Sequence, residues 1–107
     1  MADLQWNKAF ALEQTAGDEE LLEELLVIFK DSSVSDLEQL QQAVVRNDPA
    51  GVMRAAHSLK GAAATLGIEG IRQVSMAMEN DGRNNSVTVA KENLGTLIEL
   101  LDQLKSL

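Results

Sequence analysis

Apolar residues recur at helical spacing along most of the chain. The longest such stripe advances in steps of three and four and comprises Leu22, Leu26, Phe29, Ser33, Leu37, Leu40 and Val44. It predicts one long amphipathic helix. Asp18 suits the cap position of this helix, and Glu19 and Glu20 suit its first turn, where the helix dipole favours negative charge. Because Ser32, Ser33 and Ser35 interrupt the apolar face, the pattern leaves open a bend or two separate helices there.

Shorter helical patterns flank this stripe on both sides. One short helix is expected between residues 6 and 17, before Asp18. The pair Asp48 and Pro49 suits the cap and the first position of a further helix. That helix is expected to run to about residue 66, with Gly67 as its C-terminal stop.

The C-terminal part of the chain predicts two more helices. The first is expected over residues 68 to about 80 and is followed by a loop over residues 81–85. Ser86 suits the cap of the last helix, whose apolar seam comprises Val87, Ala90, Leu94, Leu97, Leu101 and Leu104. No strand-like alternation or internal repeat occurs. The sequence therefore predicts one all-α domain over residues 1–107, an up-and-down four-helix bundle with a short accessory N-terminal helix.

Composition and charge narrow the class of partner. The 107 residues suffice for one domain with one core. A net charge of −8, without a cluster of Lys and Arg, disfavours nucleic acid and anionic lipid as partners. The absence of cysteine excludes disulfides and fits a reducing compartment. Since no membrane span or signal peptide is evident, we expect a cytoplasmic protein, or a cytoplasmic piece of a larger one. We also expect it to be a monomer.

The helix that follows Pro49 carries the sole histidine, His57, away from its core stripe. That stripe comprises Val52, Ala56, Leu59, Ala63 and Leu66. At about 100° per residue, His57 points about 140° from the centre of the stripe, so it is expected to be exposed. Its face is small and partly apolar, where a solvent-facing helix usually carries charges. We interpret it as a partner-docking face comprising Ala50, Met53, Arg54, Gly61 and Ala64, with Lys60 at its margin.

Gly61 is an unusual residue for the middle of a helix. Glycine there costs about 1 kcal/mol relative to alanine, and the helical wheel turns Gly61 away from the core. It indicates either clearance for a partner beside His57 or a close crossing with another helix, and the pattern alone does not decide between them.

His57 also has the chemistry of a phosphoryl acceptor. One nitrogen of a neutral imidazole is a nucleophile, while the other can be hydrogen-bonded and oriented. Lys60, one turn later, can place an ammonium beside a transferred phosphoryl group. Taken singly, an exposed histidine and a lysine at a helix boundary are also common surface residues.

The sequence around His57 resembles the core motif of the histidine-phosphotransfer (HPt) family. The string is Ala56-His57-Ser58-Leu59-Lys60-Gly61, followed by Ala62-Ala63-Ala64 and Leu66-Gly67. The likeness extends over nearly the whole chain, through Gly17-Asp18, Glu20-Leu21-Leu22 with Phe29, Asp48, and Met78-Glu79 with Arg83. The chain departs from the family pattern at residues 32–35, where the family has more apolar bulk or a proline.

The resemblance implies a bundle whose exposed histidine takes a phosphoryl group from a receiver aspartate, or from a kinase, and passes it to a receiver aspartate. By that likeness, His57 is phosphorylated, Lys60 supports it electrostatically, Gly61 gives clearance for docking, and Glu79 orients the ring. The implied partners are receiver domains and a sensor or hybrid histidine kinase. No cofactor is expected on this chain, since the magnesium belongs to the receiver.

Two other classes of function compete with this interpretation. An enzyme is disfavoured because one histidine cannot supply two Glu-x-x-His motifs, Ser58 is too close in sequence to pair with His57, and no phosphate-cradling glycine loop is present. We therefore expect a phosphocarrier without autokinase activity. A non-catalytic adaptor bundle explains the helical periodicity equally well. It does not explain why His57, Lys60 and Gly61 share one smooth face.

Overall fold

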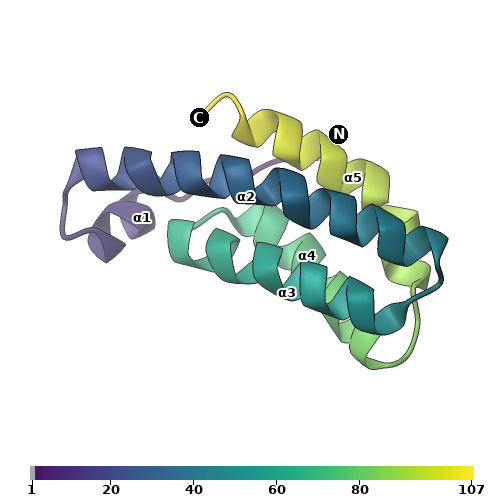
Figure 1. Cartoon of the computed structure of the whole chain (residues 1–107). Coiled ribbons are helices and arrows are strands. Elements are labelled where there is room, and N and C mark those ends of the chain that lie inside the picture. Colours follow the sequence, from purple (N-terminus) through teal and green to yellow (C-terminus); the bar gives the residue numbers. More distant parts are fainter. Residues whose placement is uncertain (1) are drawn as a thin grey trace.

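Four long helices form an up-and-down bundle, and a short N-terminal helix packs beside the first two of them (Figure 1). The computed structural model describes residues 2–107. The elements are α1 (Lys8–Gln14), α2 (Glu19–Val45), α3 (Pro49–Leu66), α4 (Glu69–Arg83) and α5 (Thr88–Leu104). Within the described residues, β pairing is limited to a single bridge between Trp6 and Ile68. The predicted all-α bundle with a short N-terminal helix is confirmed.

The helix boundaries predicted at Asp18, Asp48 and Gly67 are confirmed. The side chain of Asp18 accepts a hydrogen bond from the backbone N–H of Leu21, and Asp48 accepts one from Gly51. Gly67 ends α3 with a φ of 69°, a left-handed conformation that glycine adopts without a Cβ clash.

Helix α2 is continuous through the serine cluster. The hydroxyl of Ser33 is buried and donates to the carbonyl of Lys30 at 2.9 Å, and the hydroxyl of Ser32 donates to the carbonyl of Phe29. Because each hydroxyl finds an acceptor in its own helix, burial beside the core does not break the helix. Of the two alternatives left open by the sequence, the structure shows the single helix.

The core lies between the four long helices and is built largely from aliphatic side chains. Its largest fully buried members include Phe29, Leu22, Leu40, Leu59, Ile71, Met78 and Leu97. Every residue of the stripe predicted for α3 is buried. Burial of this apolar surface is the main force that holds the helices together.

The loop predicted over residues 81–85 is wrong in its first half, since α4 continues to Arg83. Gly82 is buried in the last turn of α4, and a Cβ atom there would lie 2.8 Å from the carbonyl oxygen of Pro49. The glycine therefore permits a close crossing of α4 over the start of α3. Gly82, which the sequence analysis assigned to a loop, is therefore a helix residue that packs against α3.

The predicted cap of the last helix also needs correction. Helix α5 begins at Thr88 with Val87 as its cap residue, and Val87 makes no side-chain capping bond. Instead, the carboxylate of Asp81 accepts hydrogen bonds from the N–H of Val89 and from the hydroxyl of Ser86, both at 2.9 Å. Ser86 contributes by accepting from the N–H of Thr88. The capping anion of α5 thus comes from α4.

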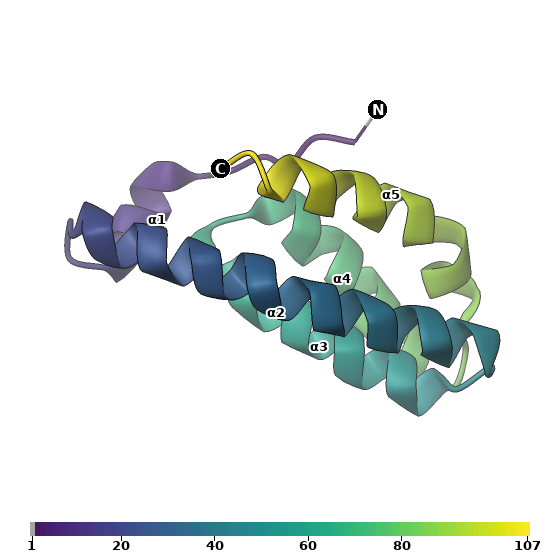
Figure 2. The ribbon, with the colours of Figure 1, turned by 45° about the horizontal axis from the view of Figure 1, so that its top comes forward.

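The N-terminal segment crosses the turn between α3 and α4 and reaches α5 (Figure 2). The N–H of Asn7 donates to the carbonyl of Gly67, and the N–H of Gly70 donates to the carbonyl of Leu4. The side chain of Gln103 bonds to the backbone of both Ala2 and Leu4. These bonds fasten the N-terminal segment to the α3–α4 turn and to α5. No helix within residues 2–107 is long and apolar enough to cross a lipid bilayer.

Candidate functional site

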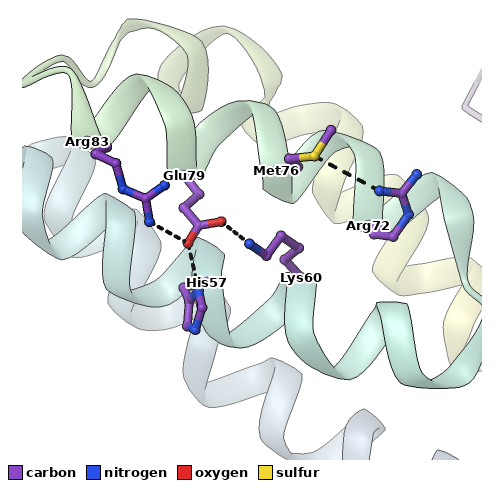
Figure 3. A network of polar contacts seen from close by, with 6 residues as sticks. All are labelled: His57, Lys60, Arg72, Met76, Glu79 and Arg83. Atoms are coloured by element: carbon purple, nitrogen blue, oxygen red, sulfur yellow. Dashed lines mark hydrogen bonds and ion pairs between the residues drawn. The ribbon is translucent and has the colours of Figure 1, made fainter.

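Helices α3 and α4 bring the side chains of four residues into one polar network (Figure 3). They are the predicted site residues His57, Lys60 and Glu79, together with Arg83. Nδ1 of His57 lies 2.6 Å from Oε2 of Glu79. Nζ of Lys60 lies 2.5 Å from Oε1 of the same carboxylate, and a guanidinium nitrogen of Arg83 lies 3.2 Å from Oε2. His57 and Lys60 are one turn apart on α3, and Glu79 and Arg83 are one turn apart on α4. Three potentially cationic groups therefore converge on one carboxylate.

Glu79 is the buried centre of this network. Its side chain is 1% exposed, whereas those of Lys60, Arg83 and His57 are 30%, 60% and 66% exposed. Burial alone would raise the pKa of Glu79, but its contacts with Lys60 and His57 and their positive charges outweigh burial. The pKa of Glu79 consequently lies below its ordinary value, and the group is a carboxylate at neutral pH.

The charge of Glu79 fixes the tautomer of His57. A carboxylate accepts hydrogen bonds and cannot donate them, so Nδ1 of His57 must carry the proton of the 2.6 Å contact. The other ring nitrogen, Nε2, keeps its lone pair when the ring is neutral. The ring borders a shallow surface pocket that is lined by Met53, Arg54, His57, Glu79 and Arg83. The exposed imidazole is thus oriented from the protein side and free on the solvent side.

The predicted docking residues surround His57 as a small, open surface. Ala50, Arg54 and Gly61 are exposed, and Met53 and Ala64 are partly buried. A Cβ atom at Gly61 would have no neighbour within 4 Å. Of the two explanations for this glycine, close helix crossing is therefore excluded. The prediction that His57 is exposed is confirmed, while the roles assigned to these residues remain predictions.

Two polar contacts near the site were not predicted. Arg83 was noted in the sequence only for its position, although the spacing of four residues from Glu79 is typical of a helical ion pair. Ser58 donates a hydrogen bond of 2.8 Å to Asp36 of α2. Sequence spacing gives no signal for this second contact, because its partners are 22 residues apart on different helices.

Comparison with known proteins decides the family. The sequence profile of the Hpt domain matches residues 24–107, which include all four members of the network. The chain belongs to the Hpt domain family. Phosphotransfer in a phosphorelay is accordingly the role of this Hpt domain. A search of curated proteins gave no match.

A solved structure shares the fold of this Hpt domain. It is the crystal structure of the HPT domain from the Hpt sensor hybrid histidine kinase of Shewanella, with 24% sequence identity and a TM-score of 0.83. The match covers 97% of this chain and 91% of the Shewanella chain. The accessory N-terminal helix and the four-helix bundle therefore both lie within a known arrangement.

Proposed function

We propose that His57 is the phosphoryl acceptor of this Hpt domain and that Nε2 is the reacting atom. The observation that carries the proposal is the 2.6 Å contact between Nδ1 of His57 and the buried carboxylate of Glu79. This contact holds the proton on Nδ1 and leaves the nucleophilic lone pair on the exposed side of the ring. Glu79 is a positioning residue, because it acts through His57.

The transfer step moves one phosphoryl group and no proton. The lone pair of Nε2 attacks the phosphorus of a receiver's aspartyl phosphate, and the bond between phosphorus and the aspartate oxygen breaks. The aspartate leaves as a carboxylate with the bonding electron pair. The ring, which keeps its Nδ1 proton, acquires a positive charge that faces the carboxylate of Glu79. Transfer to a second receiver reverses these steps.

Lys60 and Arg83 supply positive charge beside the reacting ring. Both contact Glu79, and Arg83 also lines the pocket beside His57. A phosphoryl group on Nε2 brings negative charge to this surface, and nearby cations stabilise it through charge-assisted hydrogen bonds. Lys60 therefore has two tasks: it neutralises buried Glu79 before transfer and supports the phosphoryl group after it.

The partners are receiver domains together with a sensor or hybrid histidine kinase. A receiver docks over the surface formed by Ala50, Met53, Arg54, Gly61 and Ala64, which gives its phosphorylated aspartate access to His57. The Hpt domain acts as a cytoplasmic monomer that carries the phosphoryl group without autokinase activity. It needs no cofactor of its own, because the magnesium ion is bound by the receiver.

The test is transfer from a receiver domain phosphorylated in the presence of magnesium. The expected result is acid-labile label on the wild-type Hpt domain and none on the His57→Gln variant, whose circular dichroism and melting temperature stay close to those of the wild type. Label that persists on His57→Gln would overturn the assignment. Receiver binding without any labelling of the wild type would favour a non-catalytic adaptor instead.

A further inference from the structure

Two of the seven glycines lie inside helices with open space where a Cβ atom would be. These are Gly61 in α3 and Gly95 in α5. The other glycines within helices are Gly51, Gly70 and Gly82, where a Cβ atom would come within 3 Å of neighbouring atoms. Receiver docking beside His57 accounts for Gly61. It does not account for Gly95, which destabilises its helix relative to alanine without any packing reason.

Helix α2 presents an apolar stripe to solvent. Val27, Val34 and Val45 are 55%, 55% and 85% exposed. At about 100° per residue, the three valines lie within about 20° of one another around the helix. Exposed helix faces are normally polar, whereas on this face the valines alternate with the exposed acidic residues Asp31 and Glu38. Large apolar side chains set among acidic ones can bind a partner that is both apolar and basic. We call Val27, Val34 and Val45 the valine stripe.

A groove lies between α5 and Val34, the middle residue of the valine stripe. It is lined by Val34 and Leu37 of α2 and by Ile98 and Leu101 of α5, among others. Helices α2 and α5 pack against each other, and Figure 1 shows them next to one another. Gly95 lies three residues before Ile98, about one turn nearer the N-terminus of α5. Gly95 is exposed and lies about 60° around α5 from Ile98, so its open space borders the groove without lining it.

This surface faces away from the proposed receiver-docking face. Asp36 of α2 bonds to Ser58, the neighbour of His57 on α3. Val34 lies two residues before Asp36, which places the two side chains about 160° apart around α2. A receiver on His57 would consequently leave the valine stripe uncovered.

The charges around the stripe favour a basic partner. Helix α2 carries seven acidic residues and one lysine, and α5 carries three acidic residues and one lysine. Glu20, Glu23 and Glu24 surround Val27 in a surface hollow. Two lysines near the groove are already occupied, since Lys30 donates to the carbonyl of Leu107 and Lys105 pairs with Asp102. A second copy of this chain, with its own charge of −8, would be repelled.

We propose that the valine stripe and the α2–α5 groove dock an amphipathic helix of a partner protein that carries Lys and Arg beside its apolar face. Such a helix matches both the apolar surface and its acidic rim. Val27 and Val45 are 18 residue steps apart, about 27 Å along the helix axis, so the fitting partner segment has about five helical turns. The proposal goes beyond phosphotransfer and does not depend on it.

The probe for this site is a fluorescein-labelled 18-residue peptide of Leu and Lys, with Leu at helical spacing. Fluorescence anisotropy should show saturable binding to the wild-type domain that weakens as salt is raised. The double variant Val27→Gln/Val34→Gln should weaken binding about tenfold or more, because two apolar contacts are lost. Gly95→Gln should weaken it similarly while raising the melting temperature, because its side chain blocks the groove and favours the helix.

Matched controls separate this face from the rest of the surface. Met76→Gln removes an exposed apolar side chain from α4 and should leave peptide affinity unchanged. His57→Gln should also bind the peptide normally, so failure of the phosphotransfer proposal would not affect this test. Peptide affinity that is the same in all variants would overturn the proposal. So would loss of receiver binding in the valine variant, or conversion of a dimer to a monomer, since either would show a different occupant.

Discussion

The ammonium of Lys60 and Oε1 of Glu79 lie 2.5 Å apart as an ion pair between α3 and α4. Apart from this contact, Oε1 has no hydrogen-bonding partner among residues 2–107. Oε2, in contrast, is shared by His57 and Arg83. The neutralisation of Oε1 therefore depends on Lys60, whose side chain is 30% exposed, whereas that of Glu79 is 1% exposed.

Lys60→Ala should destabilise the domain as well as slow transfer. It leaves a buried carboxylate oxygen without a partner, which costs about 1–3 kcal/mol of unfolding free energy. Lys60→Arg keeps a positive charge and should retain most of the stability. Urea denaturation measures the effect, with exposed Lys91→Ala as a control expected to change stability by less than about 0.5 kcal/mol. A Lys60→Ala variant as stable as the wild type would show that the ion pair contributes nothing.

Acid should weaken the wild type more than a variant without the carboxylate. The pKa of Glu79 is lowered in the folded state, so its stabilising contribution is complete above the ordinary glutamate pKa of about 4.3 and is lost as pH falls through the folded-state pKa. Glu79→Gln removes this titration. Its unfolding free energy should therefore fall less than that of the wild type between about pH 5 and pH 3.

The control for the pH experiment is Glu92→Gln on α5. Glu92 is exposed and forms no ion pair in the described part of the chain. Its variant should follow the wild-type pH profile. Parallel profiles for wild type and Glu79→Gln would mean that Glu79 gains no stability from its cationic neighbours.

Alanine at two helical glycines should change stability in opposite directions. Gly61→Ala relieves the mid-helix penalty in open space and should raise the unfolding free energy by up to about 1 kcal/mol. Gly82→Ala places its Cβ atom against the backbone of α3 and should lower it. Thermal denaturation of the two variants distinguishes the signs. A destabilised Gly61→Ala would mean that the helix does not tolerate a side chain there.

Gly61→Gln should leave the fold intact and impair transfer. The longer side chain stands beside His57 and holds a receiver's aspartyl phosphate away from the ring. In-line transfer needs the reacting atoms within roughly 3–3.5 Å, so a displacement of about 1 Å should slow it on the order of a hundredfold. Single-turnover transfer at normal rate in a stable Gly61→Gln domain would place receiver docking elsewhere.

Asp81→Ala should destabilise the start of α5. The Asp81 carboxylate accepts from the N–H of Val89 and thereby satisfies a donor at the helix N-terminus. Loss of a capping side chain costs about 0.5–2 kcal/mol. Hydrogen exchange at the Val89 amide should quicken in the variant, whereas exposed Asp102→Ala serves as a control with unchanged exchange at that amide. Unchanged protection of Val89 in Asp81→Ala would exclude this cap.

The regular parts of the fold were predictable because they depend on local patterns. Periodicity located the helices, and the caps Asp18 and Asp48 and the stop Gly67 are local signals. The end of α4 was not predictable in the same way. Gly82 is typical of a loop when its neighbours in sequence are considered, and its role in a helix becomes evident only from the backbone of α3 opposite it.

In the site, too, features set by local sequence were predictable, whereas features set by contacts between helices were not. The exposure of His57 follows from the helical wheel of a single helix, so sequence sufficed. The position of Glu79 followed from family resemblance, whereas its burial and its shared contacts with Lys60 and Arg83 follow from the packing of α4 on α3. The sequence also gave no indication that Asp81 caps α5, because that bond bridges two helices.

We expect phosphorylation on Nε2 of His57, because Glu79 holds the proton on Nδ1. Two-dimensional ¹⁵N–¹H NMR of the imidazole, combined with ³¹P coupling to the ring nitrogens, identifies the phosphorylated atom in domain labelled by a phosphorylated receiver. The expected result is phosphorus coupled to Nε2 of His57, with the proton on Nδ1 before and after transfer. Coupling of phosphorus to Nδ1, or phosphorus on any other residue, would contradict it.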